Sequence, residues 1–289
     1  MRRALLAVSL VACSHPSPPA HPIGDVKGLE ARIKVLEDTN ARYREALEFL
    51  DLVFTQQKAQ KAAAEANSID EDGVWAVDIA DDVKAGQVDG PATASITIIK
   101  AFDFACPYCA GAASTMDELV KDHHGEVRVV YKNMVVHTAI AMPAHLASCA
   151  AAKQGKYLAF KTAFWDKAFK PYAEKRDSTQ LGETNILAIA KDLKLDTKKL
   201  QVDMASEDCK VHVAADMAEL EKFHVDSTPT FFVNGRIVNG AMPKEQFEQL
   251  IVAGLAEVKA SGVAGGEYYA KIVMGKGEHA FRNKKTAKP

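Results

Sequence analysis

The feature that most constrains the fold is the motif Cys106-Pro107-Tyr108-Cys109, which follows the apolar run 96–104 and precedes a helical segment at 110–120. The run predicts a strand, so the motif lies at a strand-to-helix junction. A thiol at a helix N-terminus meets unpaired N–H groups and the positive end of the helix dipole, which favour the thiolate. The thiolate is the nucleophile of disulfide exchange. The motif therefore predicts reversible dithiol chemistry, with Cys106 attacking and Cys109 closing the ring to release a bound partner.

The two residues between the cysteines fit this interpretation. Pro107 takes the first helical position, where its missing N–H costs nothing. The dipeptide Pro107-Tyr108 is expected to tune the stability of the thiolate and hence the redox poise. A zinc-binding CxxC is a weaker alternative, because zinc knuckles pair two such motifs and this chain has one. The dithiol carries the electrons itself, so we expect no organic cofactor.

The histidines do not favour a metal site. The chain contains His123, His124, His137 and His145 near the motif, but none follows an HExxH pattern or pairs with a second CxxC. We therefore predict no metal.

Composition sets broad limits. The chain has 289 residues, 48% of them hydrophobic and 26% charged, which is typical of a soluble globular protein with one large or two modest domains. A net charge of −2 gives no reason to expect nucleic acid as a partner. Five cysteines are too few for a disulfide scaffold, so their positions carry the information.

The N-terminus reads as a targeting segment. Arg2 and Arg3 precede an apolar stretch at 4–12, interrupted only by Ser9, which is too short to span a bilayer. We predict a signal peptide over 1–12. The sequence Leu-Val-Ala-Cys ending at Cys13 resembles a bacterial lipobox, which implies that Cys13 is lipidated. The alternative is an ordinary signal peptide with an incidental cysteine, and either one exports the chain to a compartment where disulfides persist.

Residues 13–24 contain four prolines and predict an extended tether without a core. The pattern then changes, and residues 25–66 predict a long coiled-coil helix. Its apolar seam follows heptad spacing, with Asn40 at one a position. An Asn there fixes register and favours a two-stranded parallel arrangement, so we expect a homodimer. The alternative is a lone amphipathic helix that folds back on its own domain.

The remainder of the chain reads as mixed α/β. Strands are predicted at 74–79 and 127–131, and the second completes a parallel βαβ unit with the motif helix. An acidic connection is expected at 81–90, and a hairpin with an Asn234-Gly235 turn at 231–238. Helices are predicted over 139–152, 160–169, 185–194, 211–223 and 243–255, with Pro171 after the second. Residues 257–289 form a basic C-terminal extension.

This order of elements resembles the DsbA-like thiol-disulfide oxidoreductases of the thioredoxin-fold superfamily. The segments that carry the likeness are FDFACPYC, AMPAHLASCAAAKQGKYLAF after His137, and STPTFFVNGRIVNGA. The resemblance covers residues 73–256 and implies a thioredoxin fold with a helical insertion at about 138–223. It also implies that Pro229 is a cis proline facing the active site, with the Thr228 backbone beside Cys106 available to an extended substrate. The alternative for Pro229 is a trans turn proline that opens a strand.

Lys100 departs from the family pattern. Six positions before the first cysteine the family usually carries an acidic residue that assists proton transfer, and here that position is Lys100. A lysine there can stabilise a thiolate, or act as a base when neutral. The remaining cysteines, Cys149 and Cys209, lie in the predicted insertion and are candidates for a structural disulfide; the alternative is two buried free thiols.

The sequence therefore predicts an exported, lipid-anchored oxidoreductase of the bacterial cell envelope, facing the periplasm. Its expected partners are substrate proteins with thiols or disulfides, an unidentified redox partner and the membrane. The sequence leaves oxidase, isomerase and reductase directions open. A function of another class is a coiled-coil envelope scaffold lipoprotein whose thioredoxin-like domain binds partners without efficient turnover.

Overall fold

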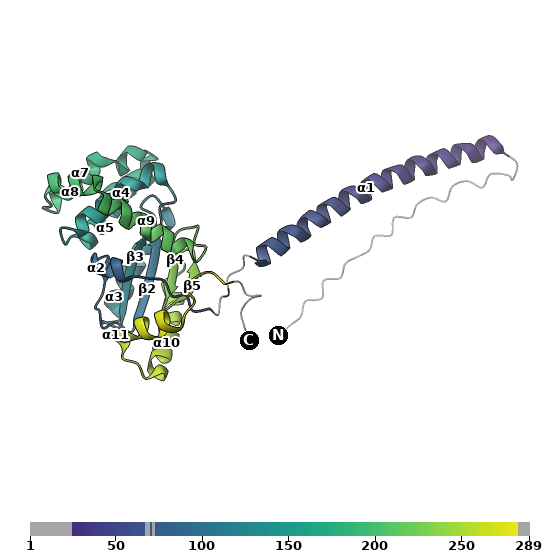
Figure 1. Cartoon of the computed structure of the whole chain (residues 1–289). Helices are drawn as coiled ribbons and strands as arrows, with labels where there is room; N and C mark the ends of the chain where they lie inside the picture. The colour runs from purple at the N-terminus through teal and green to yellow at the C-terminus, as the bar shows by residue number, and fades with distance from the viewer. Residues whose placement is uncertain (1–24, 67–69, 71–72, 283–289) are drawn as a thin grey trace. The chain divides into compact units, whose positions relative to one another are not determined.

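A computed structural model describes residues 25–66, 70 and 73–282 (Figure 1). The predicted signal peptide, Cys13 and the tether lie outside the described residues. The chain divides into two compact units, Met1–Glu65 and Ala66–Pro289, which we describe separately.

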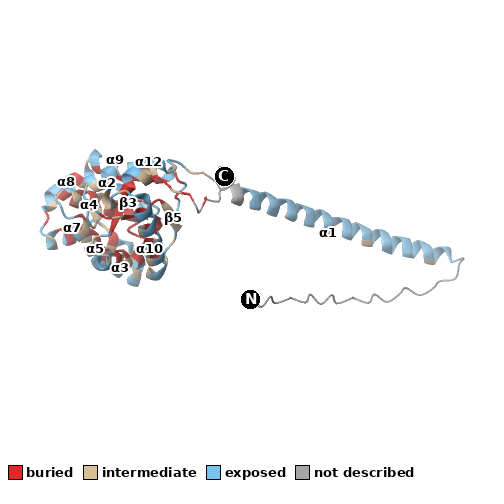
Figure 2. Cartoon of the chain, turned by 90° about the horizontal axis from the view of Figure 1, so that it is seen from below, coloured by how far each residue is buried: buried red, intermediate tan, exposed pale blue. Residues whose placement is uncertain are grey.

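The first unit contains one long helix, α1 (Val26–Ala66). Nearly all of its described side chains are exposed, as Figure 2 shows. The helix predicted from the heptads is confirmed. The apolar seam along the described helix is exposed, and the pairing of two such helices stays a prediction. The exposed seam residues are Val26, Leu29, Ile33, Leu36, Tyr43, Leu47, Leu50 and Phe54.

The second unit is built on a five-stranded sheet in the order β1-β3-β2-β4-β5. β2 pairs parallel with β3, while every other neighbouring pair is antiparallel. All residues of β2 and β3 are buried, including the polar and charged ones, as expected of paired parallel strands that are covered on both faces. The strands are β1 (Val88–Asp89), β2 (Ile96–Phe102), β3 (Val127–Asn133), β4 (Thr230–Val233) and β5 (Arg236–Asn239).

Helices cover the sheet and extend it into an insertion. α3 (Pro107–Asp122) connects β2 to β3 and also contacts α10 (Lys244–Ser261). The insertion between β3 and β4 is helical, as predicted (Figure 1). It comprises α4 (Thr138–Ala152), α5 (Tyr157–Phe164), a π-helical turn at Trp165–Phe169, α6 (Lys170–Lys175), a 3-10 turn at Ser178–Leu181, α7 (Glu183–Asp192), α8 (Thr197–Ala205) and α9 (Glu207–Glu221).

Three local predictions were wrong. Residues 74–79 form no strand beyond a single bridge of Trp75 to Glu278, because their backbone bonds the β4–β5 turn and the C-terminal segment. The stretch 81–90 is not a simple connection, since it contains most of α2 (Ala80–Lys84) and all of β1. Pro171 does not follow its helix but lies in the first turn of α6, where a missing N–H is tolerated.

An aromatic cluster joins the insertion to the sheet beneath the motif. Phe102 and Phe104 pack edge to face, with ring centroids 4.9 Å apart. From the insertion, the rings of Phe164 and Trp165 lie 4.8 and 5.2 Å from that of Phe104. The residues that lead into the motif are therefore held by contacts from both parts of the domain.

The chain beyond 256 also belongs to the second unit. α10 continues to Ser261 and is followed by α11 (Gly265–Tyr268), a π-helical turn at Tyr269–Val273 and α12 (Met274–Lys276). Tyr269 is buried and donates a hydrogen bond to the Val77 carbonyl at 2.7 Å. The domain thus extends past the range that the resemblance covers.

Candidate active site

The two motif cysteines meet at the start of α3. Cys106 is the N-cap residue, and its Sγ accepts a hydrogen bond from the Cys109 backbone N–H at 3.3 Å. Pro107 follows at the first helical position, as the sequence predicts. Both thiols are free, and both residues are buried, whereas Tyr108 between them is 69% exposed. Cys106 is 3% exposed and Cys109 is fully buried, so Cys106 is the thiol nearer to the surface.

The two thiols have opposite acidities. Hydrogen bonds from the Cys109 side chain, the Thr228 side chain and the backbone N–H groups of Cys109 and Tyr108 lower the pKa of Cys106 to about 6, against the opposing effect of burial. Burial, and then the hydrogen bond to Cys106, raises the pKa of Cys109 far above its usual value. At neutral pH Cys106 is therefore a thiolate and Cys109 a thiol, which is the division of labour expected of an attacking and a resolving cysteine.

The loop before β4 completes the site. The Thr228–Pro229 peptide bond is cis, and Pro229 is buried while Thr228 is partly exposed. The Cys106 thiol, when protonated, donates to the Thr228 carbonyl at 3.3 Å. Residues far apart in sequence are thus brought together at one sulfur atom.

Lys100 lies beneath the site, on β2. It is 1% exposed, and its Nζ donates to the carbonyl oxygen of Cys109 at 3.0 Å. Burial lowers the pKa of Lys100 to about 8. Because Lys100 replaces the acidic residue usual at this position, a buried amine rather than a carboxylate lies next to Cys109.

Asp103 is a site residue that sequence reasoning did not assign. It is completely buried, and its carboxylate accepts from the Ala105 N–H at 2.6 Å and from the N–H groups of Val136 and His137 at 2.7 Å each. The Cys106 N–H donates to the Asp103 carbonyl at 3.1 Å. Asp103 therefore ties the motif loop to the segment after β3. His137, left without a role by the sequence, contributes its backbone and places Nδ1 3.4 Å from the carboxylate.

His145, to which the sequence assigns no role, links the motif loop to the core. Its Nε2 accepts from the Phe104 N–H at 3.3 Å, so Nδ1 carries the proton and donates to the Asn133 side-chain oxygen at 2.7 Å. Burial lowers the pKa of His145 to about 4, which keeps the ring neutral. Asn133 then donates to Asp216 at 2.6 Å. No local pattern in the sequence reveals this chain of hydrogen bonds.

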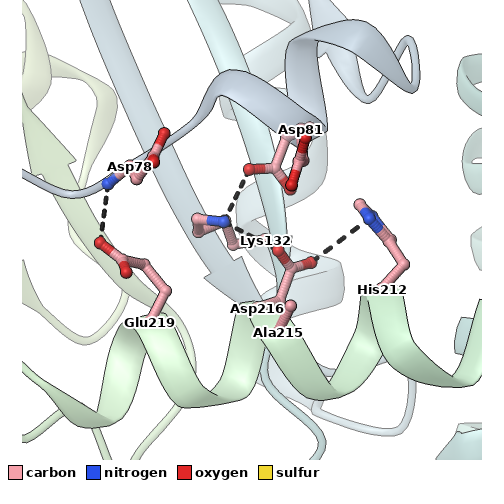
Figure 3. Close-up of a pocket in the computed structure, with 8 residues that line it drawn as sticks. Asp78, Asp81, Lys132, His212, Ala215, Asp216 and Glu219 are labelled. Carbon is pink, nitrogen blue, oxygen red and sulfur yellow. Dashed lines mark hydrogen bonds and ion pairs between the residues drawn. The ribbon is translucent and has the colours of Figure 1, made fainter.

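That chain ends in an acidic hollow of about 120 Å³ beside α9 (Figure 3). The Lys132 ammonium lies 2.6 Å from Asp82 and 2.8 Å from Asp216. His212 joins them, so that Asp82, His212 and Asp216 hold potential metal-ligand atoms within 4.8 Å of one another. Burial together with Asp216 raises the pKa of Asp82 to about 8, so Asp82 is largely protonated at neutral pH. The single positive charge of Lys132 then balances the one remaining carboxylate, that of Asp216. We assign this cluster a structural role.

Cys149 and Cys209 form a disulfide that joins α4 to α9, and the two cysteines are 60 positions apart in sequence. It lies within the helical insertion. The two cysteines of the motif and these two thus occupy separate places in the fold.

An apolar hollow of about 590 Å³ lies between α9 and the segments that reach the site. Val136, whose N–H bonds Asp103, lines one part of it, and Val225, three residues before Thr228, lines another. Met134 and Met217 contribute flexible apolar side chains, which adapt to varied partners.

Comparison with known proteins agrees with this fold and site. The chain matches the family model described as thioredoxin over residues 82–253, more than half of its length, and it belongs to this family. A thioredoxin-like oxidoreductase from Silicibacter pomeroyi is 31% identical, with a TM-score of 0.52 over 58% of this chain and 91% of that one. The structure is therefore that of a thioredoxin-like oxidoreductase with a helical insertion, as the resemblance implied.

Two further comparisons bear on fold and length. BdbD from Bacillus subtilis is 22% identical, with a TM-score of 0.53 over 66% of this chain and 100% of that one, which shows the shared fold. The Na(+)/H(+) antiporter NhaA 3 of Salinispora tropica is 31% identical over 183 residues, 62% of this chain and 26% of the antiporter. The chain spans about a quarter of the length of the curated relatives it matches. Within residues 25–66 and 73–282, no helix is long and apolar enough to cross a bilayer.

Proposed function

We propose that this protein is a thiol-disulfide oxidoreductase that acts on thiols or disulfides of other proteins through Cys106 and Cys109. The observation that carries the proposal is the contrast between the two thiols. Hydrogen bonds at the start of α3 stabilise a thiolate at Cys106, while burial keeps Cys109 protonated. Cys106 attacks a substrate disulfide to form a mixed disulfide, and Cys109 then attacks Cys106 and releases the reduced substrate; the reverse sequence introduces a disulfide.

The substrate surface surrounds Cys106. Thr228 offers its backbone beside the sulfur, where an extended polypeptide can pair as an added strand. Pro107 and the exposed Tyr108, which follow Cys106 in the chain, and Pro229, which follows Thr228, complete the proposed substrate-binding surface. The apolar hollow that Val136 and Val225 line is the adjoining place for apolar substrate side chains.

Insulin reduction tests the proposal against the scaffold alternative. The full chain should reduce insulin in the presence of a thiol donor, and Cys106→Ser should fall to the background rate. Equal background rates for both proteins would instead favour a scaffold that binds partners without turnover. The reduction potential of the Cys106–Cys109 pair then assigns the direction, because a strongly oxidising value indicates an oxidase and a value like that of thioredoxin indicates a reductase.

We further propose that the protein acts in the cell envelope, anchored through lipid on Cys13. The support is the basic and apolar start of the sequence, the cysteine after Leu-Val-Ala, and the Cys149–Cys209 disulfide, which is typical of oxidising compartments. Fractionation of cells that express the full chain tests the anchor. Cys13→Ser should move the protein from the membrane to the soluble envelope fraction, and an unchanged membrane association would contradict lipidation.

A further inference from the structure

The C-terminal segment 277–282 lies beyond the residues that match the thioredoxin family, yet it packs onto the redox domain. Glu278 pairs through its backbone with residues 74–76, in two hydrogen bonds of 2.8 Å each. Three residues later, the Phe281 N–H donates to the carbonyl of Lys222, just past the end of α9, at 2.6 Å. The segment therefore joins the start of the domain to the point where α9 ends.

The ring of Phe281 packs on His224, which lies between α9 and the loop that leads to the active site. The two ring centroids are 3.9 Å apart, and the ring planes are inclined by only 14°. Phe281 also stacks with Trp75, with centroids 6.4 Å apart and an angle of 6° between the planes. Trp75 is 1% exposed, whereas His224 is exposed. Phe281 thus links the exposed histidine ring to the buried core.

His224 has a backbone conformation that favours glycine. Its φ of 54° lies in the left-handed region, which a residue with a side chain adopts at a cost and which glycine usually supplies at the end of a helix. This conformation turns the chain out of α9, and the Val225 N–H donates back to the Leu220 carbonyl at 3.2 Å. A histidine here keeps the turn and also supplies the ring on which Phe281 packs, which a glycine could not do.

The turn at His224 sets the course of the loop that carries Thr228, four residues further on. Val225 is buried at the start of this loop, while residues 226–227 are exposed. The Thr228 carbonyl lies 3.3 Å from the Cys106 sulfur. The place of Thr228 beside that sulfur therefore depends on how firmly the turn is held.

We propose that Phe281 is a positioning residue for substrate binding, an inference that rests on the oxidoreductase function proposed above. By packing on His224, it holds the start of the loop and keeps the Thr228 backbone where an extended substrate can pair with it beside Cys106. Without the Phe281 ring the dithiol is intact, but the loop takes up more conformations. A substrate must then order the loop as it binds, which costs affinity.

Steady-state reduction of insulin by the full chain, with reduced glutathione as the donor, separates binding from chemistry. Phe281→Ala should raise KM for insulin about two- to tenfold, the range over which one aromatic pair shifts an equilibrium constant, while kcat is retained. Phe281→Tyr keeps the ring and should restore the KM of the unmodified chain.

His224→Gly removes the ring on the other side of the contact. Because glycine adopts a left-handed φ without strain, this variant should fold and keep the turn. It should show the same rise in KM as Phe281→Ala, and the double variant should add little to either change. The matched control is His124→Gly. His124 follows α3 with a φ of 45° and is exposed, and no aromatic ring among the described residues stacks on it. This control should leave KM unchanged.

The Cys106 thiol gives a second readout, because a hydrogen bond from Thr228 helps to lower its pKa to about 6. The pH midpoint of Cys106 alkylation should therefore rise in Phe281→Ala and in His224→Gly, and stay in place in His124→Gly. A ring that only stabilised the fold would lower the melting temperature without moving KM or this midpoint.

Unchanged KM and midpoint in both Phe281→Ala and His224→Gly would overturn the assignment, and so would an equal effect of His124→Gly. Absence of insulin reduction by the unmodified chain would instead overturn the proposed function. The alkylation midpoints would still report on the position of the loop in that case, so the two failures are distinguishable.

Discussion

Cys106 and Cys109 are identical side chains one helical turn apart, and their surroundings alone make them different reagents. Cys106 receives hydrogen bonds at the N-terminus of α3, while Cys109 is enclosed by the sheet and the helix. The resulting difference in acidity between the two thiols can be measured without knowing the substrate.

The first prediction concerns the reactivity of Cys106. Its rate of alkylation by iodoacetamide should follow a titration with a midpoint near pH 6, because only the thiolate reacts and the pKa of Cys106 is lowered to about 6. In the Cys109→Ser variant the serine hydroxyl can still donate a hydrogen bond to Cys106 in place of the Cys109 thiol. The alkylation midpoint of this variant should therefore stay below pH 9. A midpoint at the ordinary thiol value in the unmodified chain would contradict the thiolate assignment.

The second prediction concerns the effect of the lowered Cys106 pKa on the stability of the reduced protein as pH changes. A thiol whose pKa falls from 9.0 to about 6 on folding stabilises the reduced protein at high pH, and this stabilisation is lost as pH falls from about 9 to about 6. The melting temperature of the reduced protein, measured relative to that of the protein oxidised at the motif, should therefore rise between pH 6 and 8.5. The oxidised form is the matched control because it has no thiolate at Cys106. A flat difference would count against the low pKa.

At the scale of elements, the site depends on connections between α3, the strands beneath it and the helical insertion. The Phe102–Phe104 cluster and the chain from His145 to Asp216 hold the motif loop against α4 and α9. The disulfide between Cys149 and Cys209 joins those same two helices. The helical insertion therefore helps to hold the motif loop in place.

The third prediction concerns the contribution of the Cys149–Cys209 disulfide to stability. The double variant Cys149→Ala and Cys209→Ala should lose about 4 kcal/mol of unfolding free energy, as expected when a loop of this length is no longer closed. Urea unfolding at pH 5, where the Cys106 thiolate adds little stability, measures the loss, and Cys106→Ser with Cys109→Ser serves as the control that should remain close to the unmodified chain. We expect insulin reduction by the insertion variant to persist below its unfolding transition. Equal midpoints for the two double variants would show that the disulfide adds no stability.

At the scale of the whole molecule, the chain combines a thioredoxin-like domain with a long helix, α1, that carries an exposed apolar seam. The seam residues on α1 are about half to two-thirds exposed. A second copy offers the same heptad pattern and the same Asn40, so a parallel homodimer buries both seams in register. A dimer would place two CPYC sites in one assembly, which suits an isomerase or a reductase.

The fourth prediction addresses this pairing in the full chain. Leu29→Lys with Leu36→Lys puts charges in the seam and should yield a monomer in sedimentation equilibrium. The matched control is Val35→Lys with Leu52→Lys, which changes equally exposed apolar residues of α1 outside the a and d positions and should remain a dimer. A monomeric unmodified chain, or equal masses for both variants, would refute the seam as the interface.

The sequence by itself determined the local features of this protein. The apolar run 96–104 predicted β2, the segment 127–131 predicted most of β3, and heptad spacing predicted α1. Asn234-Gly235 predicted the hairpin turn, where both residues have positive φ. The motif and its flanks placed Cys106 at a helix start. These properties depend on a few consecutive residues, and so a linear pattern contains them.

Only the tertiary structure decided what surrounds these residues. Residues 74–79 read as a strand, yet their backbone partners come from the hairpin and from Glu278. Asp103, His145 and Lys100 gain their roles from groups that folding brings to them, such as the N–H groups of Val136 and Phe104 and the carbonyl of Cys109. Burial and hydrogen-bond partners set the acidity of a group. Both depend on how distant segments pack together, so the residues next to a group in sequence do not determine them.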